Sequence, residues 1–231
     1  MRLFLFFAIL TFASIFGFSQ TTPPRNDAQF WNDTQFIIPL KKEKDEKGKE
    51  FDRVVLFVTT TLRVGRNWQH LIDERIGFGF DFKINKYLTL TPSYVYRAGQ
   101  PFVGRSERES LYRFAVSLEK RLSKFSLKDR NLIEYRDRYR NVANSTRYRN
   151  KLQLTIPITK NKKEIFSPFV ADEVFYDFSV KAWTRNEISA GISKKFTNNF
   201  SADFFYAFQR NRGNTLKNIN IVGINLKFRI D

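Results

Sequence analysis

The sequence predicts an all-β protein, an antiparallel up-and-down transmembrane β-barrel of about 10 to 12 strands. Three observations favour this fold class. Apolar and polar residues alternate with a period of two, as near the C-terminus, where Val222, Ile224 and Leu226 share one face and Asn225 and Lys227 the other. The strand-like segments reach about 12 to 15 residues, whereas strands in soluble sheets usually have about 5 to 6. Arginines recur at alternate positions on the polar face, as expected where lipid-facing and lumen-facing side chains alternate.

The N-terminus has the pattern of a cleaved signal peptide. Arg2 precedes an apolar run from Leu3 to Phe18, and Gly17 and Ser19 supply the small residues of a cleavage site. The alternative is a membrane-anchoring helix, but about 16 apolar residues fall short of the roughly 20 that span a bilayer. We therefore expect residues 1–19 to be removed on export and the mature chain to reach the outer membrane.

The remaining composition suits one exported domain. There is no cysteine, which excludes disulfides and cysteine-based metal sites, and with a single histidine no cofactor or zinc site is expected. The net charge of +17 becomes +16 once Arg2 is removed, because residues 1–19 contain no acid. We expect lipopolysaccharide and phospholipid headgroups, rather than nucleic acid, to be the anionic partners of this exported chain.

The expected elements follow one another along the chain. Residues 20–29 read as a disordered leader, and residues 30–231 form the barrel domain, strand-rich from residue 52. A first strand-like segment, Phe30–Leu40, precedes a highly charged loop at 41–49. The further segments are 52–64, 71–85, 87–98, one marked by Tyr112 to Leu118, 125–139, 146–158, 164–178, 183–196, 199–211 and 218–230.

These ten segments already make an even number of strands, as is usual in bacterial barrels. Phe30–Leu40 would be an eleventh, so it is expected to be a periplasmic or lumenal segment, or one of two short extra strands that bring the count to twelve. Asp129, Asn131 and Asp172 fall on the lipid-facing side, which predicts a bulge or a shorter membrane band around them.

The polar breaks between the segments alternate in length. Short breaks lie near 85–86, 122–124, 160–163 and 197–199, and longer ones near 99–107, 140–145 and 211–217. Short turns are periplasmic and long loops external in outer-membrane barrels. The C-terminal strand is therefore expected to end in the periplasm, where the barrel insertion machinery would recognise it through Phe228.

The inward face carries the candidate functional site. In segment 71–85, for example, Ile76 and Phe78 face lipid whereas Arg75 and Asp81 face the lumen. The same alternation predicts a lumenal charge cluster of Arg63, Arg97, Glu134, Arg136, Arg138, Arg147, Arg149, Glu173, Arg185 and Glu187. The four arginines from 136 to 149 are expected to lie close together, with Glu134 and Glu187 near enough to pair with them.

Such a cluster is compatible with two roles. A ring of arginines would favour anions in a narrow channel or bind a phosphate or carboxylate. Arginine–glutamate pairs would equally fill the interior of a small barrel as a structural element. The alternative to a membrane barrel is a soluble periplasmic β-sheet binding protein, because apolar and polar residues also alternate in the strands of a soluble sheet.

Little in the sequence indicates an enzyme. An outer-membrane lipid- or lipopolysaccharide-modifying enzyme would need a nucleophile beside a base, and the single histidine, His70, has Trp68 but no serine near it in sequence. No Gly-x-Ser-x-Gly motif occurs. We therefore expect no catalytic residues and treat the enzyme as the alternative.

Short motifs spread over nearly the whole mature chain resemble an uncharacterised family of Gram-negative outer-membrane proteins, the domain-of-unknown-function family numbered 2490. The motifs are Trp31, Leu62-Arg63, Asn85-Lys86-Tyr87, Tyr96-Arg97, Glu134-Tyr135-Arg136-Asp137-Arg138-Tyr139, Arg147-Tyr148-Arg149, Pro168 with Glu173, and Arg185. The resemblance implies a barrel in the outer membrane. The family has no established activity, so the resemblance implies no catalytic residue.

Overall fold

The described part of the chain folds into β-strands joined by turns. A computed structural model describes residues 25–44, 48, 50–102, 104–139, 142–161, 163–213 and 216–230; the predicted signal peptide and residues 20–24 of the predicted leader lie outside them. The strands are β1 (Asn26–Lys44), β2 (Glu50–Gly65), β3 (His70–Lys83), β4 (Leu88–Phe102), β5 (Arg105–Arg121), β6 (Ser126–Arg138), β7 (Ser145–Thr155), β8 (Ile158–Lys160), β9 (Lys163–Asp177), β10 (Ala182–Lys195), β11 (Phe200–Asn211) and β12 (Asn218–Arg229). No helix in the described ranges is long and apolar enough to cross a membrane.

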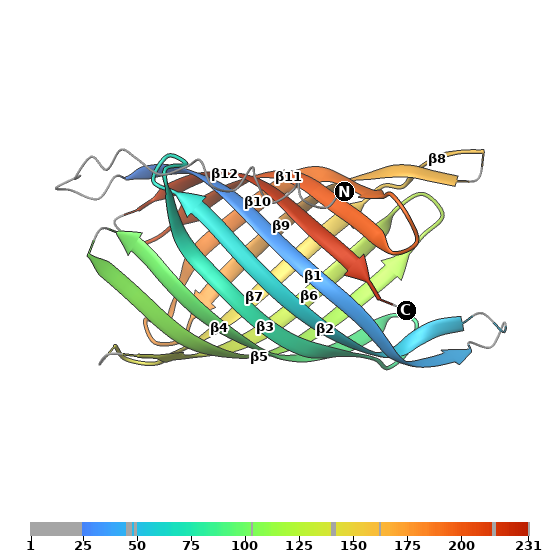
Figure 1. The fold of residues 1–231 in the computed structure, drawn as a ribbon, viewed down its shortest axis with the longest axis horizontal. Coiled ribbons are helices and arrows are strands. Elements are labelled where there is room, and N and C mark those ends of the chain that lie inside the picture. Colours follow the sequence, from blue (N-terminus) through green and yellow to red (C-terminus); the bar gives the residue numbers. More distant parts are fainter. Residues whose placement is uncertain are drawn as a thin grey trace, which may run out of the picture.

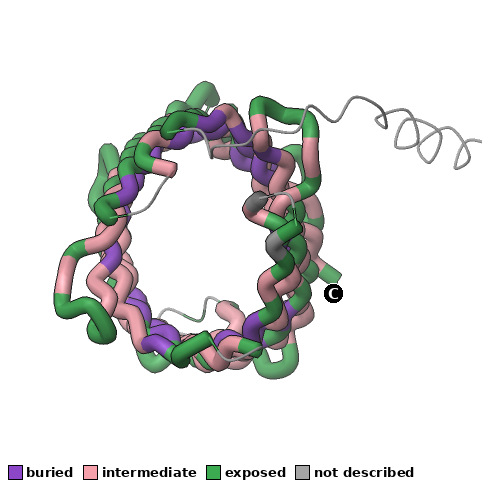
Figure 2. Tube along the Cα trace, turned by 90° about the vertical axis from the view of Figure 1, so that its left-hand side faces the viewer, coloured by how far each residue is buried: buried purple, intermediate pink, exposed green. Residues whose placement is uncertain are grey.

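The strands close into a barrel, which Figures 1 and 2 show from the side and from one end. Neighbours in sequence pair antiparallel around the wall, and β9 pairs with both β7 and β10. The short β8 pairs with β9 in continuation of β7. The two are separated at Ile156 and Pro157, and proline has no N–H to donate to the ladder. The twelve segments therefore form an 11-stranded wall, which confirms the predicted barrel of 10 to 12 strands.

One pair of strands departs from the antiparallel plan. β1 and β12 pair in parallel, from Asn26 opposite Asn218 to Ile37 opposite Arg229. Phe30–Leu40 is an extra strand of the wall, as one of the two predicted alternatives had it, but it is the eleventh strand and not one of two that bring the count to twelve. The alternative of a periplasmic or lumenal segment is wrong: the segment belongs to β1, which begins at Asn26 within the predicted leader. With an odd number of strands the first and last run in the same direction, so the barrel can close only through a parallel pair.

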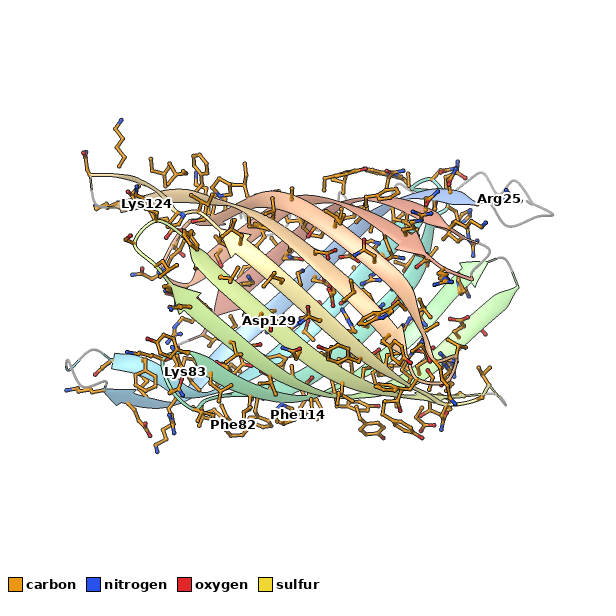
Figure 3. All side chains as sticks on the ribbon, turned by 180° about the vertical axis from the view of Figure 1, so that it is seen from behind. Arg25, Phe82, Lys83, Phe114, Lys124 and Asp129 are labelled. Carbon is orange, nitrogen blue, oxygen red and sulfur yellow. The ribbon has the colours of Figure 1, made fainter. Side chains whose placement is uncertain are left out.

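Alternation gives the wall an apolar outside and a polar inside. Ile76, Ile133 and Phe204 project outward and are 57%, 53% and 50% exposed, and Phe82 and Phe114 project from the outer surface in Figure 3. Glu134, by contrast, faces inward and is fully buried. A water-soluble β-barrel has the opposite arrangement, with its apolar side chains packed inside.

Aromatic side chains form rows on the outer surface of the wall. The rings of Tyr94, Tyr112 and Tyr135 follow one another across β4, β5 and β6, with neighbouring centroids 5.4 and 6.4 Å apart. Near the end of the barrel at which β12 finishes, Phe228 stacks between Phe36 and Phe200 at 5.5 and 4.9 Å. We call this the C-terminal end and the other, where β1 and β12 begin, the opposite end.

The polar residues expected to disturb the outer face do not cause a bulge. The registers of β6 with β7 and of β7 with β9 run without a shift past Asp129, Asn131 and Asp172, and Asp129 lies between the two ends in Figure 3. Instead the groups bind one another. Asn150 Nδ2 donates to Asp129 Oδ1 at 2.6 Å and Asn186 Nδ2 to Asp172 Oδ1 at 2.5 Å. These bonds offset part of the penalty of turning polar groups outward.

At the opposite end of the barrel, the connection between β4 and β5 differs from the prediction. The expected long loop at 99–107 is mostly strand, because β4 continues to Phe102 and β5 begins at Arg105. A register shift between Gly99 and Phe102 marks an irregularity there, and such bulges bend a strand without ending it. The short turns expected near 85–86, 122–124 and 197–199 lie at the C-terminal end.

Candidate lumenal anion site

All ten sequence-predicted cluster residues lie on the inner face of the wall. They come from six strands: Arg63 from β2, Arg97 from β4, Glu134, Arg136 and Arg138 from β6, Arg147 and Arg149 from β7, Glu173 from β9, and Arg185 and Glu187 from β10. Nine of them line the lumenal cavities, and the tenth, Glu134, is buried beneath its arginine partners.

Glu134 is the centre of one ion-pair group. Arg113 Nε lies 2.6 Å from Glu134 Oε2, Arg147 donates to Oε1, and Arg149 Nη1 lies 3.7 Å from Oε2. The register explains the pairing with Arg147, which stands directly opposite Glu134 in the β6–β7 ladder. Arg149 also reaches Glu173, with 2.7 Å between Nη2 and Oε1.

A second ion-pair group lies nearer the opposite end. Asp73 accepts from both Arg75 and Arg97 at 2.8 Å. Arg136 Nη2 lies 2.5 Å from Glu109 Oε1, and Arg138 Nε lies 3.6 Å from the same oxygen. Each carboxylate therefore forms ion pairs with two or more guanidinium groups. In this way a few carboxylates pair with several lumenal arginines from strands β3 to β9.

The expected single cluster of four arginines is therefore divided. Arg136 and Arg138 go to Glu109, whereas Arg147 and Arg149 go to Glu134. Glu187 makes no ion pair within the described residues, contrary to expectation, because it stands opposite Glu173 in the β9–β10 ladder. Asp73, Glu109 and Arg113 are members that the sequence-predicted cluster lacks. The alternation of apolar and polar residues predicts that they face the lumen. Arg113, for example, lies between the outward Tyr112 and Phe114.

Two lumenal arginines remain outside these groups. Within the described residues neither Arg63 nor Arg185 makes an ion pair, and the buried Nε of Arg63 has no hydrogen-bond partner. The Arg63 guanidinium carbon lies 3.6 Å from the Trp31 ring centroid. Arg185 donates its Nε to Asn211 at 2.9 Å and lies 5.0 Å from the Phe175 ring. Aromatic faces attract both cations without supplying a negative charge to pair with them.

Trp31 is itself held by a chain of hydrogen bonds along the inner face of β1. Its indole Nε1 donates to Gln29 at 2.7 Å, and Gln29 Nε2 donates to Asp27 at 2.7 Å. Asp27 accepts the backbone N–H groups of Arg66 and Asn67 at 3.1 and 2.8 Å. Both turn residues have a positive φ, and the carboxylate binds the two N–H groups that this conformation presents together.

The lumen contains two cavities that meet at these arginines. One of about 860 Å³ lies towards the C-terminal end and one of about 1340 Å³ towards the opposite end. Five residues line both cavities: Trp31, Arg63, Arg75, Arg147 and Arg185. We call these five the arginine belt. Because four of the five are arginines, the region in which the two cavities meet is basic.

The structure gives no support to a catalytic histidine or a metal site within the described residues. His70 begins β3 opposite Gly65, and no described residue makes a hydrogen bond or ion pair with its imidazole. Within the described part of the chain no group of three or more His, Asp or Glu side chains is placed to hold a metal ion.

Comparison with known proteins supports the family resemblance. The model of the family described as "Protein of unknown function (DUF2490)" matches residues 28–220. A solved structure of the NanC porin in a rhombohedral crystal form is similar at 10% identity with a TM-score of 0.48, covering 84% of this chain and 93% of that one. No curated protein matches significantly.

Proposed function

The chain belongs to the DUF2490 family of proteins of unknown function, and we propose that it is an integral outer-membrane β-barrel whose lumen is a narrow anion-selective pathway. The proposal includes export through a cleaved signal peptide at residues 1–19 and insertion into lipid. Its support is the arrangement of the wall, the charge of the lumen and the open space within it.

The outer surface supports the membrane location. It carries rows of apolar side chains, with a row of tyrosines across β4 to β6 and a phenylalanine stack at the C-terminal end. Barrels that cross an outer membrane carry an apolar band between two aromatic girdles. The closed ladder pairs the backbone groups of every strand with its neighbours, as a hydrocarbon environment requires.

The observation that carries the anion pathway is the arginine belt. The ion-paired arginines of β3 to β9 account for structural filling, but Arg63 and Arg185 add two cations that make no ion pair within the described residues. The cavities on both sides are also basic: eleven basic and seven acidic side chains line the smaller, and ten basic and five acidic the larger. A basic constriction in a low-dielectric wall raises the local concentration of anions.

The test is conductance in a planar bilayer with a salt gradient across it. The wild-type protein is expected to show a steady conductance whose reversal potential favours the anion. Arg63→Gln with Arg185→Gln should move the reversal potential towards that of an unselective pore, because the belt loses the two cations that lie outside the ion-pair groups. Folding of each variant is checked by its heat-modifiable migration on a gel.

A matched control removes a cation outside the lumen. Lys124 lies in the connection between β5 and β6 at the C-terminal end (Figure 3) and lines neither lumenal cavity. Lys124→Gln should leave the reversal potential unchanged. Correctly inserted wild-type protein that carries no current, or a current that favours cations, would contradict the proposal.

A further inference from the structure

We infer that the anion received by the smaller lumenal cavity is an organic one, a carboxylate or similar oxyanion attached to an apolar body. This inference rests on the proposed function and names the class of solute for the same site. The argument comes from the apolar side chains that share this cavity with the arginine belt.

The inner wall of a water-filled barrel is normally polar, yet here it carries an apolar group beside the arginine belt. Phe57, Val95, Ala115, Leu132, Phe169 and Phe205 all line the smaller cavity. They come from six different strands, β2, β4, β5, β6, β9 and β11, so the apolar surface is spread around the lumen. We call these six residues the apolar ring.

The phenylalanines of the apolar ring do not plug the lumen, because glycines make room for them in the wall. A Cβ added to Gly79 would lie 2.5 Å from Phe57 Cζ, and one added to Gly191 would lie 2.8 Å from Phe169 Cζ. Gly223 is covered in the same way by the ring of Phe205. Each ring is seated where a neighbouring strand lacks a side chain, and a cavity of about 860 Å³ remains in front of them.

The apolar ring and the charged groups are close enough to contact one small molecule. On β5 and β6 an apolar residue lies two positions from a basic one: Ala115 from Arg113 and Leu132 from Arg130, and all four line the smaller cavity. Two residues along a strand span about 7 Å, roughly the length of a benzoate ion. Phe175 joins the two regions, since Arg149 and Arg185 lie 4.6 and 5.0 Å from its ring.

This arrangement discriminates between anions of equal charge. Acetate and benzoate gain alike from the basic side chains, but only benzoate removes an apolar face from water when it meets the apolar ring. Burial of an aromatic ring of this size corresponds to about tenfold or more in affinity. Chloride, which has no apolar part, should gain nothing from the phenylalanines.

The test measures binding and conduction separately on the folded full-length mature protein. Titration calorimetry in detergent is expected to give a benzoate Kd at least about tenfold below that of acetate. Phe205→Leu should reduce this benzoate preference roughly threefold or more, and Phe57→Leu gives a second variant should the first fail to fold. Phe204→Leu is the matched control: the neighbouring residue projects outward, so the preference should stay at the wild-type value.

The outcomes distinguish this inference from the proposed function. Equal affinities for benzoate and acetate, or equal losses in Phe205→Leu and Phe204→Leu, would overturn the inference even if the bilayer shows an anion-selective current. A benzoate preference that depends on Phe205, in a protein that carries no current, would uphold the inference as a binding site and overturn the conduction.

Discussion

At the scale of single residues, the lumenal network depends most on Glu134. Its carboxylate is fully buried and is shared by Arg113, Arg147 and Arg149. The removal of one partner from a buried charge group leaves the others uncompensated. Glu134 therefore acts as the counter-ion that allows three guanidinium groups from β5 and β7 to lie close together.

Glu134→Gln tests this role. The variant keeps the shape of the side chain but leaves three neighbouring guanidiniums without their negative charge, so the free energy of unfolding should fall by about 3–5 kcal/mol. The measurement is urea-induced unfolding of the barrel in detergent or lipid. The control is Glu119→Gln, whose partner Arg121 is 83% exposed, and its effect should stay within about 1 kcal/mol. Equal effects of the two variants would show that Glu134 has no special structural role.

The sequence was sufficient to predict which charges face the lumen but not how they pair. A period of two assigns Arg63, Arg147 and Arg185 to the inner face without further information. Pairing depends on the register between strands, which places Arg147 opposite Glu134 and Glu187 opposite Glu173. The absence of an ion pair at Arg63 and Arg185 within the described residues could therefore not be predicted from the chain alone, because it depends on which carboxylates come within ion-pair distance.

At the scale of elements, the predicted strands agree closely with the observed ones because each is long and strongly alternating. The segment 183–196 corresponds to β10 and 199–211 to β11, each within one residue at either end. β1 was predicted too short, and its place in the wall was only one of two alternatives. Its outward face includes Asn32 and Thr34, which weakens the alternation, and the usual even strand count argued against an eleventh strand in the wall.

Neighbouring residues of β12 provide a test of the face assignment. Ile224 lies on the outer face and Asn225 lines the smaller cavity. Ile224→Arg should impair folding into lipid by about 2–4 kcal/mol if it lies near the bilayer midplane, because the charge would meet hydrocarbon. Asn225→Arg should be tolerated. The measurement is the fraction of folded, heat-modifiable protein in vesicles over a urea series, and equal tolerance of both variants would reverse the assigned faces.

At the scale of the whole molecule, the fold depends on the parallel seam between β1 and β12. Eleven strands leave both terminal strands running in the same direction, so the seam brings together residues about 192 positions apart, as in the hydrogen bond between Asn218 and Asn26. Without this seam β1 and β12 would expose two unpaired edges, which a bilayer does not accommodate. The register of the seam is therefore the feature that most directly defines this barrel.

A pair of introduced cysteines can test the register between β1 and β12, because the chain has no cysteine of its own. Ala28 stands opposite Asn220, and both lie on the outer face. Ala28→Cys with Asn220→Cys should therefore form a disulfide on mild oxidation, since paired Cα atoms fall within the range of about 4.4–6.8 Å that a disulfide requires. The linked chain should migrate differently from the reduced chain after boiling without reductant.

The control, Ala28→Cys with Val222→Cys, moves one cysteine two residues along β12, about 7 Å out of register, and should stay reduced. A disulfide in the control but not in the first pair would shift the register, and a disulfide in neither would contradict closure of the barrel through a β1–β12 seam.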